Sequence, residues 1–348
     1  MNQTSGIRVL IPSGAGAPGF AGILRCLRED ATIQVITGDM QESPYGKSLA
    51  DGFYQVPASS ANNYIEKILE ICKKEAIQAV LPITTGELLP LVKHQSLFES
   101  EGIQLVISKT ESLEIANNKG NLYKFIRENC PQIPIPEFAI VRTKVEFKQA
   151  VEILLNQFPE ACFKPVVGNG SRGFGRVVKN VTSDFLSAKA GVMPLLLEEW
   201  LLRFPEILPV ELLVSAYLPG KEYSVDVLAE HGKTLLCIPR TRDKMVGGIS
   251  VAGTFVNDLS IKAFSMRLVQ ALELNGPIGL QWKEDVQGMP HLLEINPRLQ
   301  GTTSAALFAG ANIPLLAVYQ ALGLEMKINT LQIQWGGKFG RHWEDDQL

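Results

Sequence analysis

The stretch 278–298, IGLQWKEDVQGMPHLLEINPR, has two β-prone arms around a central Gln287–Gly288 pair. Such a pair is typical of the two-residue turn of a β-hairpin. With that turn, antiparallel pairing places Gln281 opposite Glu294, and residues directly opposite each other share one face. The same alternation directs Leu293 to the other, apolar face. The sequence therefore predicts a hairpin whose polar face carries Gln281 and Glu294.

The polar face of this hairpin has the ligand types of a magnesium site. Asn296, two residues beyond Glu294, shares the face with Glu294 and Gln281. A carboxylate and two amide oxygens suit Mg²⁺, which takes one or two protein ligands and completes its shell with water and phosphate. Polar alternation on a half-exposed strand is the alternative explanation. Arg298 adds a cation beside the cluster, which favours the metal site.

Upstream of the hairpin, a glycine cluster with the sequence KPVVGNGSRGFG occupies residues 164–175. A hairpin with this many glycines can lie flat on a triphosphate and present backbone N–H groups to it, while the lysine supplies a point charge. A surface hairpin without a ligand is the alternative. The candidate phosphate-binding residues are Lys164, Gly168, Gly170, Ser171 and Gly173.

Two arginines, Arg240 and Arg242, lie in the segment CIPRTRDKMVGGIS (237–250). At spacing i, i+2 on a strand end they share a face, and together they can bind a carboxylate or a phosphate. A surface ion-pair role is the alternative. The Gly247–Gly248 pair that follows suggests a mobile cover over the site.

The N-terminal stretch IPSGAGAPGF (11–20) contains Gly14, Gly16 and Gly19 in the spacing G-x-G-x-x-G. This spacing lets a pyrophosphate approach the backbone and a helix N-terminus. Asp39 ends the next apolar run, about where a ribose-binding carboxylate is expected. An NAD-dependent oxidoreductase is therefore one hypothesis for the chain.

The first hundred residues alternate short apolar runs with helical segments, which is typical of a parallel sheet with helices on both faces. Ser108 and Glu111 have capping-box spacing, so we expect a helix to start near residue 109 and place the first domain boundary there. The later segments read as strand–turn–strand units. They predict an antiparallel α+β arrangement in place of a second parallel sheet.

The bulk composition is that of an ordinary enzyme. The chain has 348 residues, a formal net charge of −3 and five scattered cysteines without a C-x-x-C pair, so we expect neither a nucleic-acid nor a membrane partner. The longest apolar stretch near the C-terminus, IPLLAVYQALGL, is too short to span a bilayer. The first residues, MNQTSGIRV, have no apolar signal-peptide core. We therefore expect a cytoplasmic protein.

Three motifs in this order, FKPVVGNGSRGFG, YLPGKEYSVDV and LLEINPRLQGT, resemble the ATP-grasp superfamily over roughly residues 109–322. The resemblance is to the synthetase component of carbamoyl-phosphate synthase and its stand-alone relatives. It implies a Rossmann-like α/β domain (1–108) before a two-lobed α+β ATP-grasp domain (109–348). The small glycine-loop lobe is expected at about 136–220 and the catalytic lobe at 221–348. In this family the N-terminal glycine turn usually binds no dinucleotide.

The resemblance also implies roles for individual residues. Lys164 and Lys119 would contact the ATP phosphates, and Arg298 would face the transferred phosphate or the acyl substrate. The hinge strand VSAYLPG would meet the adenine edge with its backbone at two positions, and an acidic residue after it would bind the ribose. These three residues are Ala216, Leu218 and Glu222, and the metal ligands would be Gln281, Glu294 and Asn296. The hinge departs from the pattern, because the family commonly has an acidic residue where Ala216 stands.

The implied activity is ATP-dependent ligation of a carboxylate to an amine through an acyl phosphate, with ATP and Mg²⁺ (or Mn²⁺) as cofactors. The sequence leaves the two small-molecule substrates open: bicarbonate, an amino acid and a peptide all remain candidates. A homodimer is a reasonable expectation for such enzymes. A regulator that binds ATP without turning it over, and the NAD-dependent oxidoreductase, are the alternatives.

Overall fold

The computed structural model describes residues 6–168, 172–180 and 194–342. Its N-terminal domain is a five-stranded parallel sheet of order β3-β2-β1-β4-β5, with apolar clusters on both faces. The strands are β1 (Ile7–Ile11), β2 (Ile33–Asp39), β3 (Gly52–Gln55), β4 (Ala79–Val80) and β5 (Gln104–Leu105). The helices are α1 (Phe20–Leu27), α2 (Tyr64–Lys74), α3 (Thr85–Lys93) and α4 (Gln95–Ser100), with a short 3-10 turn η1 (Tyr45–Lys47). The predicted parallel α/β unit is confirmed.

Two helices, α5 (Thr110–Ala116) and α6 (Lys119–Asn129), connect this domain to the rest of the chain. Helix α5 begins one residue later than expected, and the predicted capping box is wrong. The Ser108 hydroxyl donates to the Asn275 carbonyl and accepts from the Asn275 amide, both at 2.8 Å. A tertiary partner therefore takes the hydroxyl that local spacing assigned to the helix start.

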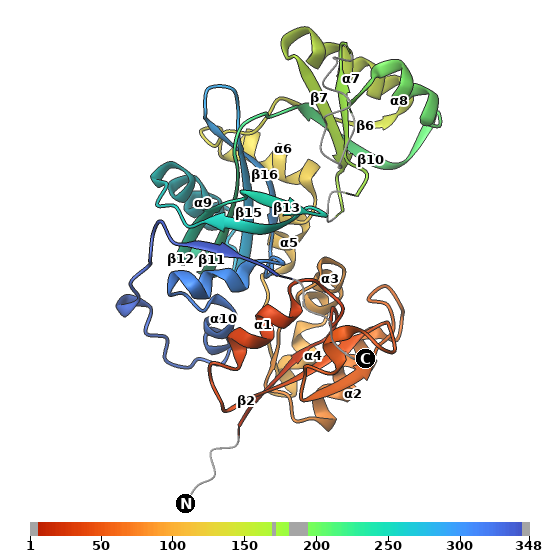
Figure 1. The fold of residues 1–348 in the computed structure, drawn as a ribbon. Helices are drawn as coiled ribbons and strands as arrows, with labels where there is room; N and C mark the ends of the chain where they lie inside the picture. The colour runs from red at the N-terminus through yellow and green to blue at the C-terminus, as the bar shows by residue number, and fades with distance from the viewer. Residues whose placement is uncertain (1–5, 169–171, 181–193, 343–348) are drawn as a thin grey trace, which may run out of the picture.

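The small lobe is built on a five-stranded sheet of order β6-β10-β7-β8-β9 and stands apart at the top of Figure 1. Its strands are β6 (Phe138–Thr143), β7 (Glu160–Pro165), β8 (Gly175–Val178), β9 (Pro194–Leu196) and β10 (Ile207–Ala216), and its helices are α7 (Lys144–Gln157) and α8 (Leu197–Arg203). Rings from three elements, Phe147, Phe163 and Trp200, meet edge to face at 4.8–5.2 Å between centroids. These rings give the lobe a hydrophobic core of its own.

The catalytic lobe carries a four-stranded antiparallel sheet of order β12-β11-β15-β16. Its strands are β11 (Glu222–Glu230), β12 (Lys233–Thr241), β15 (Gly276–Glu284) and β16 (Pro290–Asn296). A second sheet contains β13 (Lys244–Val246), β14 (Ile249–Thr254) and β17 (Lys338–Gly340). The helical elements are α9 (Leu259–Ala271), η3 (Thr303–Ala309), α10 (Ile313–Ala321) and η4 (Ile328–Thr330). The antiparallel α+β arrangement expected after the first domain is confirmed.

The N-terminal domain and the catalytic lobe share one hydrophobic core, which includes residues of β1, α1, β12 and α10. The seam is close. A Cβ on Gly19 would lie 2.9 Å from the backbone of Gly301, and one on Gly22 would lie 2.3 Å from the Ser304 hydroxyl. Only glycines let α1 approach the loop after β16 in this way. The third glycine of the G-x-G-x-x-G turn thus serves packing between the two parts of the chain.

The hairpin of β15 and β16 pairs Gln281 with Glu294, as predicted, but reaches this register by a different route. The turn has three residues, because the Asp285 amide donates to the Met289 carbonyl at 3.0 Å. A register shift at Leu293 then restores the expected pairing. The predicted two-residue turn is therefore wrong. So is the placement of Leu293 on the apolar face, where its neighbour Leu292 is buried instead.

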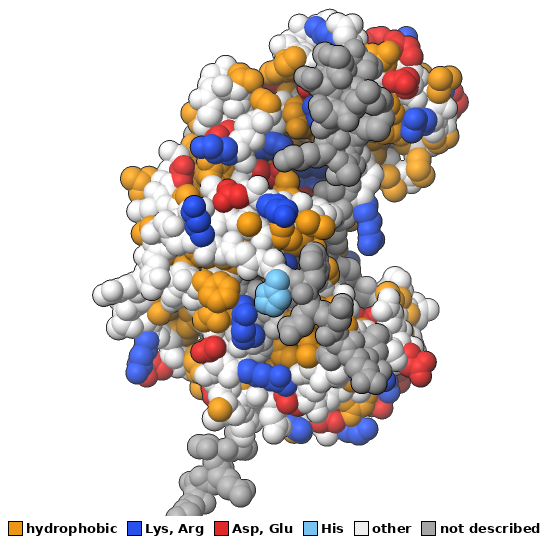
Figure 2. Space-filling model, in the orientation of Figure 1, with side chains coloured by type: hydrophobic (Ala, Val, Ile, Leu, Met, Phe, Trp, Pro, Cys, Tyr) orange, Lys and Arg blue, Asp and Glu red, His pale blue; other side chains and the backbone are white. Residues whose placement is uncertain are grey.

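Within the described residues no single helix is long and apolar enough to cross a membrane, although the pair η3 and α10 passes that test together despite a 105° bend between them. Figure 2 shows basic and acidic side chains interspersed on the visible face, without a region of one sign. In the same view the outline narrows to a notch between the small lobe and the N-terminal domain.

Candidate functional site

The polar face of the four-stranded sheet gathers most of the predicted site residues. On β11, Glu222 and Ser224 alternate with core residues such as Tyr223 and Val225, because successive side chains point to opposite faces. Ser224 pairs with Gln281 on one side and with Arg240 on the other. The four strands therefore present one continuous polar surface, with a packed apolar core beneath it.

Two lysines and one carboxylate form the centre of this surface. Lys119, the first residue of α6, places its Nζ 3.2 Å from the Glu294 carboxylate and 2.9 Å from the Gly168 carbonyl. Lys164, at the end of β7, donates to the Leu293 carbonyl at 3.0 Å. That carbonyl is available because the register shift in β16 frees it from the β15 ladder. The bulge thus contributes directly to the site.

The charges in this cluster shift one another's pKa values. Burial favours the neutral form of Glu294, but the attraction of Lys119 and Lys164 outweighs it and lowers the pKa of Glu294 to about 2. For Lys164 the balance is reversed: burial lowers its pKa, although Glu294 favours the charged form. Glu294 is therefore a firmly ionised carboxylate, and the lysine ammonium group is poorly solvated. A phosphate would satisfy such an ammonium group.

The glycine loop lies partly beyond what can be described. Gly168 is fixed by Lys119, and Gly173 has the left-handed backbone (φ 72°) that a turn in this loop requires. Gly170 and Ser171, two of the predicted phosphate-binding residues, fall outside the described residues.

The predicted metal ligands line one pocket of about 100 Å³. Gln281 faces Glu294 across the hairpin, and the Asn296 amide donates to the Glu294 carboxylate at 3.1 Å. Within the described residues no group of three His, Cys, Asp or Glu side chains could hold a metal. The donor set of one carboxylate and two amides nevertheless fits Mg²⁺, which prefers oxygen ligands and takes its remaining ones from water and phosphate.

Arg298 lines the same pocket and is held from three directions. Its Nε donates to the Thr85 hydroxyl at 3.0 Å, and its two terminal nitrogens donate to the Leu299 carbonyl at 2.7 Å and to Asn296 Oδ1 at 3.2 Å. Burial lowers its pKa, while Glu294 favours its charged form. Thr85 belongs to the N-terminal domain, so that domain reaches the site.

Arg242 also lines the pocket, whereas Arg240 lies behind its wall. Arg242 pairs with Glu222 at 3.0 Å, and Lys283 lies 3.7 Å from the same carboxylate. Arg240 is fully buried, and its Nε donates to Asp226 at 2.7 Å. Neither terminal nitrogen of Arg240 has a hydrogen-bond partner among the described residues, although its guanidinium lies over the Phe339 ring. The structure thus separates the two arginines that spacing placed in one anion-binding pair.

The hinge residues follow the end of β10. The Ala216 amide donates to the Glu137 carbonyl at 3.0 Å, and its carbonyl lies 3.9 Å from the buried Cys162 thiol. Leu218 is buried just beyond it, in the segment that leads to Glu222 at the start of β11. The three predicted nucleotide-binding residues of this region therefore lie where the small lobe joins the catalytic lobe.

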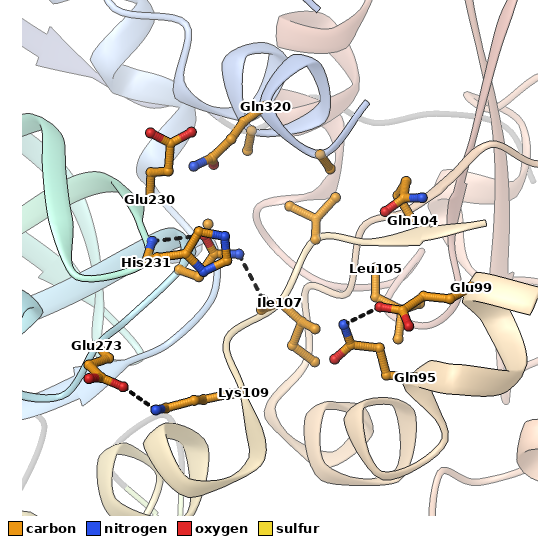
Figure 3. Close-up of a pocket in the computed structure, with 15 residues that line it drawn as sticks. Gln95, Glu99, Gln104, Leu105, Ile107, Lys109, Glu230, His231, Glu273 and Gln320 are labelled. Carbon is orange, nitrogen blue, oxygen red and sulfur yellow. Dashed lines mark hydrogen bonds and ion pairs between the residues drawn. The ribbon is translucent and has the colours of Figure 1, made fainter. Parts of the chain in front are cut away.

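A larger cavity of about 450 Å³ lies where α4 and β5 approach the β11–β12 turn and α10 (Figure 3). Lys109 pairs with Glu273 there (Figure 3), and the side-chain amide of Asn275 donates to the Ile107 carbonyl at 3.2 Å. None of the described candidate residues lines this cavity. Size alone does not make a site, so we place the chemistry in the smaller, cation-rich pocket.

The N-terminal glycine turn is hydrogen-bonded to Asp39, the acidic residue at the end of β2. The Asp39 carboxylate accepts from the Gly16 amide at 3.0 Å and from the Gln41 amide at 3.0 Å. A dinucleotide would need both the Gly16 amide and the Asp39 carboxylate. These contacts therefore weigh against the oxidoreductase hypothesis.

Sequence reasoning missed two polar residues that organise the site, Asp226 and Thr85. Asp226 is an acid in the middle of β11, flanked by Val225 and Val227, and an acid at such a position was a signal. Thr85 follows Thr84 in a capping box closed by Glu87, and the spacing T-x-x-E before an apolar run was readable. Its contact with Arg298 was not, because 213 residues separate the two.

Comparisons with known proteins agree with this geometry. Residues 209–336 match the family model described as ATP-grasp in the biosynthetic pathway with Ter operon, and residues 21–106 match the PylC-like N-terminal domain. A comparison with curated proteins finds no matching sequence.

Several solved structures share the fold. An N5-carboxyaminoimidazole ribonucleotide synthetase in complex with ADP has 16% identity and a TM-score of 0.68, covering 96% of this chain and 80% of its own. The biotin carboxylase domain of the Hydrogenobacter thermophilus 2-oxoglutarate carboxylase, a dimer with MgADP and bicarbonate, has 16% identity and a TM-score of 0.67 (95% and 73%). An L-amino acid ligase from Bacillus licheniformis has 15% identity and a TM-score of 0.65 (92% and 75%). The chain therefore resembles the ATP-grasp superfamily, with an ATP-grasp match over residues 209–336, a PylC-like match over residues 21–106 and the fold of the solved structures.

Proposed function

We propose that the protein is an ATP-dependent ligase that joins a small carboxylate to an amine through an acyl-phosphate intermediate. The observation that carries the proposal is the cluster that Lys119 of α6 and Lys164 of β7 form around Glu294 of the β15–β16 hairpin. A buried and a half-buried lysine beside an ionised carboxylate are arranged to receive a polyphosphate and its divalent ion.

The chemistry divides into two steps. A substrate carboxylate oxygen attacks the γ-phosphorus of ATP, the bond to the β–γ bridging oxygen breaks, and ADP leaves. The amine nitrogen then attacks the acyl carbon, phosphate leaves with the bonding electrons of the C–O bond, and the nitrogen loses a proton. Such phosphoryl transfer needs positioning and charge neutralisation rather than covalent help from the protein.

The chain's own residues supply these needs. Lys119 and Lys164 would bind the phosphates beneath the glycine loop, and Arg298 would meet the transferred phosphate or the carboxylate. Arg242, which lines the same pocket, would hold the substrate carboxylate. The adenine would lie against the backbone at the hinge (Ala216 and Leu218), with its ribose near Glu222.

Gln281, Glu294 and Asn296 would hold Mg²⁺, with Mn²⁺ as a substitute. When bound, the ion would neutralise phosphate charge and polarise the γ-phosphate. Two of the structures with the same fold are ADP complexes, and one of them also holds magnesium and bicarbonate, which supports the choice of nucleotide and metal. A homodimer is part of the proposal, because one of these neighbours is a dimer.

The test is ADP release across a panel of carboxylates and amines, offered singly and in pairs. We expect Glu294→Ala and Lys164→Ala to abolish substrate-stimulated ADP release while circular dichroism shows an intact fold. Lys148→Ala, on an exposed i, i+4 ion pair of α7, is the matched control and should retain full activity. Normal ADP release by either site variant would refute the assignment. ATP binding by the wild type without ADP release for any pair would favour the regulator.

A further inference from the structure

The guanidinium of Arg298 is oriented by Thr85, a residue for which the site has given no other role. Its Nε donates to the Thr85 hydroxyl at 3.0 Å, a contact between the catalytic lobe and the N-terminal domain. The other two guanidinium nitrogens donate to the Leu299 carbonyl and to Asn296, both next to Arg298 in its own segment. Thr85 is therefore the distant contact that sets the direction of the guanidinium plane.

Thr85 is itself held firmly. It is the first residue of α3, and the Glu87 carboxylate closes the capping box by accepting from the amides of Ile83 at 2.8 Å and Thr84 at 2.7 Å. The second carboxylate oxygen of Glu87 accepts from the Tyr64 hydroxyl at 3.1 Å. Three hydrogen bonds to the Glu87 carboxylate thus fix the turn at the start of α3, so the Thr85 hydroxyl is a fixed acceptor for Arg298.

Glu87 is an unusual cap. Its side chain is completely buried, and its carboxylate accepts hydrogen bonds from neutral amides and from the tyrosine hydroxyl. Burial raises its pKa to about 7. An exposed carboxylate would cap the helix without this cost. Glu87 lies beyond the carboxyl end of β4, which is the neighbour of β1 in the sheet. The strand order reverses between these two strands, and ligands of parallel sheets bind in the crevice at such a point. Arg298 reaches into that crevice.

We propose that Thr85 is a positioning residue that aims Arg298 into the pocket, so that the N-terminal domain completes the catalytic site. The inference rests on the proposed function, because Arg298 is taken to meet the reacting group. It assigns the N-terminal domain a part in the reaction through Thr85, whereas the glycine turn of that domain serves packing.

The experiment compares Thr85→Val, which keeps the shape but removes the acceptor, with Thr85→Ser, which keeps the hydroxyl. Thr110→Val is the matched control, since Thr110 is also a half-buried first residue of a helix. We expect Thr85→Val to lower kcat/KM for the carboxylate about tenfold to a hundredfold, because a hydrogen bond to a charged group is lost and the guanidinium swings. The KM for ATP should stay unchanged, and Thr85→Ser should restore most of the activity.

A second measurement does not depend on activity. The Nε–H signal of Arg298 in a ¹H–¹⁵N spectrum, assigned by its loss in Arg298→Lys, should shift or broaden in Thr85→Val and keep its position in Thr110→Val. Unchanged kinetic constants together with an unchanged signal would overturn the inference. If the wild type releases no ADP, the proposed function fails, and the spectrum alone then decides whether Thr85 orients Arg298.

Discussion

Glu294→Gln offers the sharpest test of the charge balance in the site. Gln has nearly the shape of a protonated Glu, so the substitution mimics protonation of the carboxylate. Lys119 and Lys164 lower the pKa of Glu294 from 4.5 to about 2. At about 1.4 kcal/mol per pKa unit, ionised Glu294 contributes about 3 kcal/mol to folding at pH 7. We expect Glu294→Gln to lower the free energy of unfolding by about this amount.

The direction of the Glu294 pKa shift determines how the free energy of unfolding depends on pH. Because the folded-state pKa is lowered, the contribution is fully present above pH 4.5 and is lost as the pH falls towards 2. The gap between wild type and Glu294→Gln in urea unfolding, followed by fluorescence, should therefore be constant from pH 7 to 5 and shrink between pH 4.5 and 3. Glu273→Gln, on an exposed ion pair, is the control. Equal stabilities at pH 7, or a gap that stays constant down to pH 3, would refute the reasoning.

Three further outcomes follow from the packing. Asp226→Asn should destabilise the fold by about 3–5 kcal/mol, because it leaves the buried Arg240 without a counter-charge, and Asp226→Leu with Arg240→Met should recover most of the loss in thermal unfolding. Gly279→Ala should raise the KM for the carboxylate without changing the KM for ATP, because its Cβ would lie 2.0 Å from the side chain of Gln300, which lines the pocket. All five cysteines are wholly or partly buried and their pKa values are raised, so a native-state titration with a disulfide reagent at pH 8 should find no fast-reacting thiol; a rapid stoichiometric reaction would contradict the burial.

The sequence was sufficient for the features that depend on local alternation. The parallel first domain, the antiparallel later sheets and the pairing of Gln281 with Glu294 all follow from strand periodicity. The route to that pairing was not readable. The shift at Leu293 exposes a carbonyl to Lys164 and Tyr123, which come from distant segments of the chain. A bulge stabilised by such partners leaves no local signature.

Other errors share this cause. The Ser108 hydroxyl was assigned to a helix start, but Asn275 binds it. Arg240 and Arg242 were treated as equals from their spacing. Arg240 is buried in an ion pair with Asp226, and only this contact distinguishes it from Arg242. Local spacing identified which residues carry the chemistry, and long-range contacts decided what each of them touches.

The core that runs from β1 and α1 to β12 and α10 limits how this molecule can move. The N-terminal domain and the catalytic lobe share a buried apolar interface, so they cannot hinge against each other without exposing that interface to water. The small lobe has a core of its own, but Val166 and Leu213 at the base of its sheet also pack into the core of the catalytic lobe. The N-terminal domain and the catalytic lobe therefore form one base, and any movement of the small lobe over this base would have to retain the buried contacts of Val166 and Leu213.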